Sequence, residues 1–200
     1  MVKLKEPKTQ RIAFIVIVTV VFLIVTCFTN DVYRGSYLKY SNGDFNNTTG
    51  GTVHYSYRTG SETQYVHFYE DVYQNGELVS TEWLLSLGVG GEVWKSKLSL
   101  TLSETPNLDW TLNADGAVID WTTKLADPSY SGRTVEYLKF GKQDLTCQDD
   151  LVLAAVYQER AFGKVNVYPQ VCENILDDLD AVISNNDTVV LIRMVTSQKP

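Results

Sequence analysis

The chain has 200 residues and a formal net charge of −7, with 24 Asp and Glu against 17 Lys and Arg. The first eleven residues hold four of the basic side chains and one of the acidic ones, so the remainder has 13 basic and 23 acidic residues, a net charge of −10. Such an acidic domain cannot neutralise the phosphates of a nucleic acid, which excludes nucleic-acid binding. Twelve Tyr and four Trp with only five Pro exclude a disordered chain.

An uncharged apolar run covers residues 12–29 and follows a basic segment, residues 1–11. Eighteen residues of helix extend about 27 Å, close to the roughly 30 Å of a bilayer's hydrocarbon core, so the run predicts a single transmembrane helix. The basic residues before the run predict a cytoplasmic N-terminus. We therefore expect a single-pass protein of the cell membrane, whose C-terminal domain is extracytoplasmic.

Two alternatives to a retained anchor share this layout. A cleaved signal peptide needs small residues at its exit, and residues 26–29 (TCFT) do not match that pattern. A lipoprotein signal would attach lipid to Cys27, but Ile24, Val25 and Thr26 before it are bulkier than that signal requires. The sequence favours the retained anchor, with a cleaved signal peptide and lipidation of Cys27 as open alternatives.

The segment after the anchor is polar. Residues 41–51 (SNGDFNNTTGG) are rich in Asn, Gly and Thr, which is typical of a loop. We therefore predict a linker over residues 30–51. Residues 52–200 are enough for one domain with its own core.

Residues 64–86 predict a β-hairpin around Asn75 and Gly76, a dipeptide that favours two-residue turns. Such a turn pairs residues whose numbers add up to 151. The predicted core face then contains the pairs Val66 with Leu85, Phe68 with Trp83, Glu70 with Thr81, and Val72 with Val79.

The rest of the chain continues the strand pattern. Strands are predicted at residues 53–57, 97–101, 134–140, 151–157 and 188–195, and a second hairpin at residues 108–125 around the turn 113–116. From Pro169 the apolar residues follow a helical period, and Asn185 with Asn186 can end that helix. All four Trp residues are expected in the core. The predicted fold is mainly β, a β-sandwich-like antiparallel sheet with one C-terminal helix; an α+β sheet is the alternative.

Cys147 and Cys172 are the cysteines of the predicted extracytoplasmic domain. In an oxidising compartment they are a candidate disulfide that would join the helix to the sheet. Two buried free thiols are the alternative.

Signals for catalysis are few. His54 and His67 are the only histidines, neither lies near a cysteine, and no Ser occupies a Gly-x-Ser-x-Gly motif. The GVGG sequence at residues 88–91 is followed by Glu92, so it predicts a turn and not a phosphate-binding loop. We therefore predict no catalytic residues, no cofactor, no metal site and no enzymatic activity.

The candidate binding residues are Tyr65, His67, Tyr69 and Tyr73, which alternate along one strand. Aromatic rings on an exposed sheet face can stack on sugars or anchor a protein partner. The alternative is that these rings pack under a second sheet or a loop.

One N-terminal anchor followed by one β-rich domain, with its Tyr-rich strand, Asn-Gly turn and Leu-containing strand, resembles the small exported proteins of unassigned function found in Gram-positive bacteria. The resemblance concerns organisation and implies no site residues. The expected function is a membrane-anchored extracytoplasmic interaction domain that binds protein or glycan at the cell envelope. The alternatives are an accessory subunit of a membrane assembly and, third, an envelope hydrolase.

Overall fold

A computed structural model describes residues 16–22, 24, 35–44, 50–91, 94–104, 107–125, 133–139, 141–159 and 179–200. The chain divides into two compact units, Met1–Gly35 and Ser36–Pro200. In the first unit residues 16–22 and 24 are helical, and their large apolar side chains are exposed, Phe22 to 67%. Among the residues described, no helix is long and apolar enough to cross a membrane.

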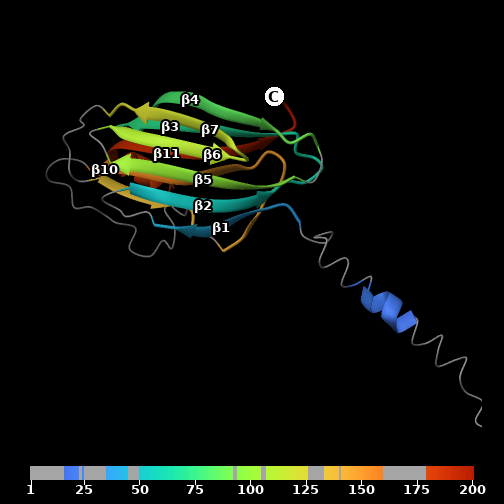
Figure 1. Ribbon diagram of the computed structural model, residues 1–200. Helices are drawn as coiled ribbons and strands as arrows, with labels where there is room; N and C mark the ends of the chain where they lie inside the picture. Colours follow the sequence, from blue (N-terminus) through green and yellow to red (C-terminus); the bar gives the residue numbers. More distant parts are fainter. Residues whose placement is uncertain are drawn as a thin grey trace, which may run out of the picture. The chain divides into compact units, whose positions relative to one another are not determined.

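The second unit contains two antiparallel sheets (Figure 1). Sheet A has the strand order β7-β6-β5-β2-β1-β9, and sheet B has the order β4-β3-β11-β10-β8. The bounds are β1 (Tyr37–Gly43), β2 (Gly50–Arg58), β3 (Tyr65–Gln74), β4 (Glu77–Gly88), β5 (Lys95–Glu104), β6 (Leu108–Ala114), β7 (Ala117–Thr123), β8 (Arg133–Tyr137), β9 (Gln143–Asp144), β10 (Asp150–Glu159) and β11 (Asn186–Ser197). The prediction of a mainly β, sandwich-like fold is confirmed.

The main core lies between the two sheets. Alternate residues of β5 and β6, such as Leu100 and Leu112, are fully buried against Phe68 and Ile192 of sheet B. The hydroxyl of Tyr55 in β2 donates to the carbonyl of Leu153 in β10 at 3.0 Å, and so joins the sheets directly. Burial raises the pKa of Tyr55, so this hydroxyl remains a donor.

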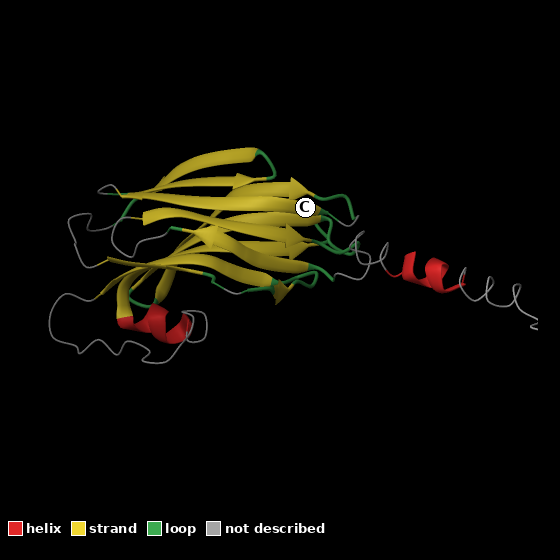
Figure 2. Cartoon of the chain, turned by 60° about the horizontal axis from the view of Figure 1, so that its bottom comes forward, coloured by secondary structure: helices red, strands yellow, loops and turns green. Residues whose placement is uncertain are grey.

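A smaller core lies on the outer side of sheet B. The helix α2 (Leu179–Asn185) buries Val182 against Val189 and Leu191 of β11 (Figure 2). The helix ends where Asn186 donates its side-chain amide to the carbonyl of Val182 at 2.7 Å, which confirms the predicted end at Asn185 and Asn186. Residues 169–178 of the predicted helix lie outside the described residues.

The register of the β3–β4 hairpin differs from the prediction. The turn is the expected one, with positive φ at Asn75 and Gly76, and Tyr73 pairs with Leu78. However, Val79 and Leu84 each occupy a β-bulge, so that Tyr69 pairs with Trp83. The predicted pairs of Val66 with Leu85, Phe68 with Trp83, Glu70 with Thr81 and Val72 with Val79 are therefore wrong, since each bulge inserts one unpaired residue into β4.

The bulges also change which Trp residues are buried. One extra residue reverses the direction in which side chains point, and Trp83 is consequently 64% exposed on the outer side of sheet B. Trp94 is 37% exposed. The expectation of four core Trp residues is thus wrong for these two, whereas Trp110 is buried and Trp121 packs against the core.

The predicted linker contains a strand. Within residues 30–51, β1 spans Tyr37–Gly43, pairs with β2, and buries Tyr37 and Leu38. Asp44 accepts from the backbone N–H of Thr52 at 2.7 Å, which fixes the start of the β1–β2 connection. The compact domain therefore begins at Ser36. The predicted linker is too long because β1 adjoins the polar stretch, residues 41–51, that suggested a loop.

The cysteine predictions stay largely open. Cys147 is half-buried and has a free thiol in the structure. Its predicted partner, Cys172, lies outside the described residues, as does Cys27. The disulfide and the lipidation of Cys27 remain predictions.

One carboxyl group is buried between the sheets. Glu70 of β3 is 3% exposed and accepts from the indole N–H of Trp121 at 2.7 Å and from the hydroxyl of Thr123. Burial is the main reason that the pKa of Glu70 is raised; the hydrogen bonds from Thr123 and Trp121 oppose the shift, and the charges of Glu82 and Asp71 add to it. The folded state thus favours the protonated form of Glu70.

This burial predicts a pH-dependent gain in stability for Glu70→Gln. A group whose pKa is raised by folding stabilises the fold below its unfolded pKa, about 4.3 for Glu, and this contribution is lost as the pH rises through the folded pKa. We expect the free energy of unfolding of Glu70→Gln to exceed that of the wild type by about 1 kcal/mol at pH 8, and the difference to vanish near pH 4. Urea unfolding across this pH range measures it.

The matched control is Glu77→Gln, which neutralises an exposed carboxylate in the same hairpin. It should show no gain that grows with pH. A wild type as stable as Glu70→Gln at pH 8 would contradict the prediction.

Candidate functional site

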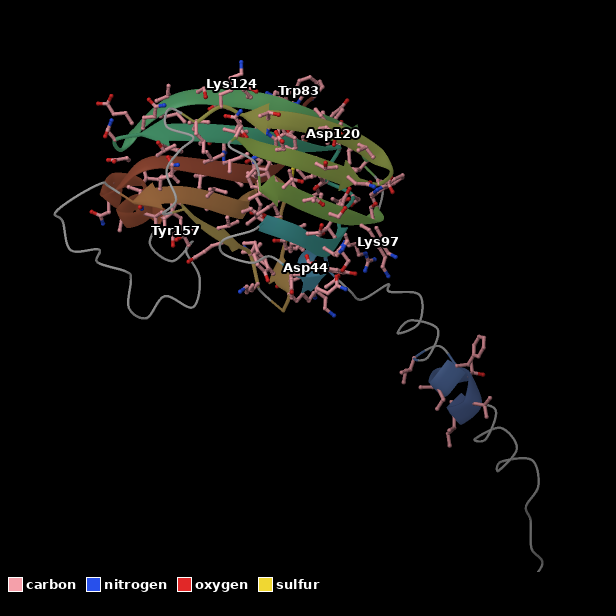
Figure 3. The ribbon with its side chains drawn as sticks, turned by 60° about the vertical axis from the view of Figure 1, so that its left-hand side comes forward. Asp44, Trp83, Lys97, Asp120, Lys124 and Tyr157 are labelled. Carbon is pink, nitrogen blue, oxygen red and sulfur yellow. The ribbon has the colours of Figure 1, made fainter. Side chains whose placement is uncertain are left out.

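The outer side of sheet B carries a group of aromatic rings that includes the exposed Trp83 and the buried His67. Tyr65, His67 and Tyr69 alternate along β3, and Trp83 lies opposite Tyr69 on the edge strand β4. We call these four residues the aromatic face. Trp83 projects from β4 at the surface (Figure 3), and Tyr65 and Tyr69 are partly exposed. The three β3 rings lie on one side because side chains of a strand alternate.

His67 is held between its neighbours. Its ring lies 5.9 Å from the Tyr65 ring with an angle of 13° between the planes, and 6.2 Å from the Tyr69 ring. Nε2 is 3.1 Å from the carbonyl oxygen of Lys199, which can only accept, so Nε2 carries the proton. In the neutral ring Nδ1 then accepts from the hydroxyl of Ser86 at 2.7 Å. Both ring nitrogens are engaged, which fixes the orientation of the His67 ring between the two tyrosine rings.

A charged cluster adjoins the aromatic face. The Nε of Arg193 in β11 forms an ion pair with Oδ2 of Asp71 at 2.6 Å, and its Nη1 forms another with Asp150. Thr81 donates to Asp71 at 2.7 Å. The guanidinium of Arg193 also lies 5.6 Å from the centre of the Tyr69 ring, within the range of a cation–π interaction.

The charge of Arg193 is fixed by these contacts. Burial acts to lower the pKa of the guanidinium, but the contact with Asp71 and the charge of Asp150 outweigh it, so the pKa is raised. The aromatic face is therefore bordered by a permanent cation held in place by two carboxylates.

Tyr73 does not belong to the aromatic face, although it is partly exposed like Tyr65 and Tyr69. It lies on the same side of β3, but its ring packs against the small core under α2. Burial, together with the negative charge of Asp71, raises the pKa of its hydroxyl. Of the four predicted binding residues, the structure thus brings Tyr65, His67 and Tyr69 together and separates Tyr73.

Sequence reasoning missed Trp83 and Arg193. The prediction of a buried Trp83 is wrong because two bulges shift the register of β4. A signal for them exists: the apolar doublets Leu78-Val79 and Leu84-Leu85 interrupt the alternation of β4, and each contains a bulged residue. Arg193 lies in an apolar strand far along the chain, and only the pairing of β11 with β3 places it beside Tyr69.

The chemistry available on this face is stacking and hydrogen bonding. Trp83 and Tyr69 offer ring surfaces, while Arg193 and the Tyr hydroxyls offer polar groups at their edge. Within the described ranges no three His, Cys, Asp or Glu side chains are grouped so that they could hold a metal ion.

No protein-family model matches the chain, and no curated protein or solved structure shows significant similarity to it.

Proposed function

We propose that the protein is a membrane-anchored extracytoplasmic interaction domain that binds a glycan of the cell envelope through its aromatic face. The observation that carries this proposal is the exposure of Trp83 directly beside Tyr69 on a sheet surface. A large aromatic side chain left 64% exposed loses the stabilisation that burial would give it, which favours a role in binding.

The surroundings of the two rings favour a sugar. Sugars present C–H groups that stack on aromatic rings and hydroxyls that need polar partners. The rings of Tyr65 and Tyr69 flank the hydrogen-bonded ring of His67, and Arg193 is held at the edge by its ion pair with Asp71. Such preorganised groups lose little entropy when a ligand binds.

A protein partner is the second candidate. Leu78 and Val79 on the same edge strand are 53% and 58% exposed, and they extend the apolar surface beyond what a sugar needs. Trp, Tyr and Arg are also the residue types that dominate protein interfaces.

The anchor is part of the proposal. Residues 12–29 are uncharged, and the apolar side chains described there are exposed on the helix, among them Ile17 at 60%. Insertion in a bilayer would cover this surface. Alkaline extraction of membranes should leave the full chain in the pellet.

The glycan proposal predicts that Trp83→Ala weakens retention on envelope polysaccharide by at least about tenfold, a free-energy loss of about 1.4 kcal/mol. Tyr69→Ala should weaken retention similarly, because the two rings form one surface. Affinity electrophoresis in gels containing the polysaccharide, with circular dichroism as a test of folding, measures both.

Two matched controls define the surface. Trp94→Ala removes an indole that is 37% exposed outside the aromatic face, and Tyr73→Phe removes a hydroxyl beside α2; both should bind like the wild type. Wild-type retention of folded Trp83→Ala and Tyr69→Ala would rule out the aromatic face. If Trp83→Ala and Tyr69→Ala lose binding to a protein fraction of the envelope and not to the polysaccharide, the protein partner is favoured.

The accessory-subunit alternative has its own test. If the anchor pairs with other membrane helices, a stable partner should co-purify in detergent, and replacing residues 12–29 by an unrelated apolar span should release it. Loss of the partner with Trp83→Ala, and not with the replaced span, would assign the interaction to the aromatic face.

A further inference from the structure

The outer side of sheet A, which belongs to the other sheet of the sandwich, carries an open hollow of about 790 Å³. Its lining comes from β1, β2, β5, β6 and the turn between β6 and β7. The side chains that matter are Asn42, His54, Ser56, Lys97, Ser99 and Asn113. The volume is within the range of small-molecule sites.

The strand register places these side chains in rows. Asn42, His54, Ser99 and Asn113 pair successively across four strands and form one row. Lys39, Ser56 and Lys97 form the next row across β1, β2 and β5. Since neighbouring strands lie about 4.8 Å apart, each row presents polar groups at a spacing that one small molecule can bridge.

Neighbouring rows on the same side of sheet A differ from the hollow. There the side chains satisfy one another: Thr52 hydrogen-bonds Thr101 at 2.9 Å, Thr111 donates to Asp120 at 2.6 Å, and Thr122 donates to Asp109 at 2.7 Å. These rows need no ligand.

Most side chains of the rows in the hollow do not satisfy one another, although Oδ1 of Asn113 accepts from the backbone N–H of Gly116 at 3.2 Å. Among the described residues, the side chains of His54, Ser56 and Ser99 have no hydrogen-bond partner, and Lys97 has no ion-pair partner. Because His54 and Lys97 are exposed, their polar groups are available to a molecule from solution. The contrast with the adjacent rows points to a binding site.

The hollow is also basic on an acidic protein. Lys95 and Lys97 line it and Lys39 follows in the second row, whereas the chain as a whole has a net charge of −7. Lys97 lies at the surface near the start of β5 (Figure 3). Local positive charge of this kind concentrates anions.

One acid completes the site. Asp115, in the turn after β6, lines the hollow beside Lys97, whose carbonyl accepts from the Asp115 N–H at 3.1 Å. Its Oδ1 accepts from Ser96 at 2.6 Å. A carboxylate repels phosphate but accepts hydrogen bonds from hydroxyls. A phosphate therefore suits the β2 side of Lys97, where His54 lies, and hydroxyls suit the β6 side, where Asp115 lies.

We infer that this hollow binds a phosphate-bearing sugar or polyol, with the phosphate at Lys97 and His54 and the hydroxyls toward Asn113 and Asp115. The outward side chains of the two rows include no Tyr or Trp, so recognition here uses charge and hydrogen bonds, unlike the stacking expected on the aromatic face.

The test uses the full chain in lauryldimethylamine oxide micelles, with glucose 6-phosphate as the probe. Broadening of the probe's ³¹P resonance on titration gives its dissociation constant, which we expect near 1 mM, a free energy of about −4 kcal/mol. Lys97→Gln should weaken binding at least fivefold, since the charge-assisted hydrogen bond to phosphate is lost. His54→Gln should weaken it by a smaller factor.

Lys124→Gln is the matched control, because it removes the same charge from an exposed lysine that does not line the hollow (Figure 3). It should bind like the wild type. An equal loss in Lys97→Gln and Lys124→Gln would show unspecific attraction and overturn the site, as would the absence of broadening by the wild type. Equal affinity for inorganic phosphate and glucose 6-phosphate would overturn the inference that the site also binds the hydroxyls of a sugar or polyol.

Two further arms complete the experiment. Phosphatidylglycerol added to the micelles should displace the probe if the natural ligand is a lipid headgroup, and should leave it bound if the ligand is a free or polymer-borne sugar phosphate. Trp83→Ala should not change binding of the probe. The proposed ligand site in the hollow and the proposed function of the aromatic face can therefore be refuted independently of each other.

Discussion

Replacing Trp110 by alanine is expected to lower the free energy of unfolding by about 3–5 kcal/mol, the largest loss for any single core position. Trp110 is 1% exposed, and its ring stacks on that of Trp121 at 5.9 Å with an angle of 11° between the planes. Its indole N–H donates to Thr123 at 3.1 Å. The variant would leave a cavity and remove the donor that orients the Thr123 hydroxyl.

The loss extends to the buried carboxyl group. Thr123 hydrogen-bonds both Trp110 and Glu70, so a shift of its hydroxyl weakens the contact that compensates Glu70 for burial. Because domains of this size are stable by about 5–15 kcal/mol, Trp110→Ala removes a large share of the total.

Urea unfolding followed by far-UV circular dichroism measures this effect. Trp110→Phe, which keeps most of the ring volume, should lose about 1–2 kcal/mol and remains measurable if Trp110→Ala does not fold. Trp94→Ala is the control for removing an indole, since Trp94 is 37% exposed, and should lower the free energy of unfolding clearly less than Trp110→Ala does. Equal losses in Trp110→Ala and Trp94→Ala would contradict the core assignment.

Arg193→Ala is expected to lower the free energy of unfolding by about 3–5 kcal/mol, because it leaves the carboxylate of Asp71 buried without its cation. The Asp71 side chain is only 4% exposed, and the Arg193 side chain is 21% exposed. Thr81 alone would then stabilise the negative charge through its hydroxyl. The ring of Tyr69 would also lose its cation–π partner.

A double variant separates the interaction from simple loss of side chains. Arg193→Met combined with Asp71→Leu removes both charges and keeps apolar volume, so we expect it to recover most of the stability. Asp150→Asn serves as the control, since the Asp150 side chain is 50% exposed, and should cost less than about 1 kcal/mol. A double variant no more stable than Arg193→Ala would show that packing, and not the buried charge, is what matters.

The strand pattern was predictable where local rules decide it. The turn at Asn75 and Gly76, the buried run of β10 and the end of α2 each depend on a few neighbouring residues, and each appears where the sequence places it. The inward leucines of β5 and β6 follow from strict alternation.

The predictions are wrong where contacts between distant residues, or irregularities within a strand, determine the structure. Val79 and Leu84 shift the β3–β4 register although the turn is correct, and this moves Trp83 from the predicted core to the surface. β1 was predicted as linker because its polar end adjoins glycines, and its pairing with β2 is what makes it a strand.

The residues of the candidate site that lie on one strand could be predicted from the sequence, whereas those brought there by distant elements could not. Alternation along β3 identifies Tyr65, His67 and Tyr69 as one group. Nothing local indicates that α2 packs on Tyr73 or that β11 brings Arg193 to Tyr69, because these contacts join residues more than 100 positions apart. The hollow on sheet A likewise depends on the register of four strands.

The two bulges of β4 have a consequence for how the protein behaves at high concentration. β4 is an edge strand with exposed Leu78, Val79 and Trp83, and a straight edge of this composition would be a template for pairing with a second chain. At Val79 and Leu84 the regular spacing of backbone donors and acceptors is interrupted and the strand bends. We therefore expect the same irregularity that turns Trp83 outward to hinder pairing of this edge with a second chain.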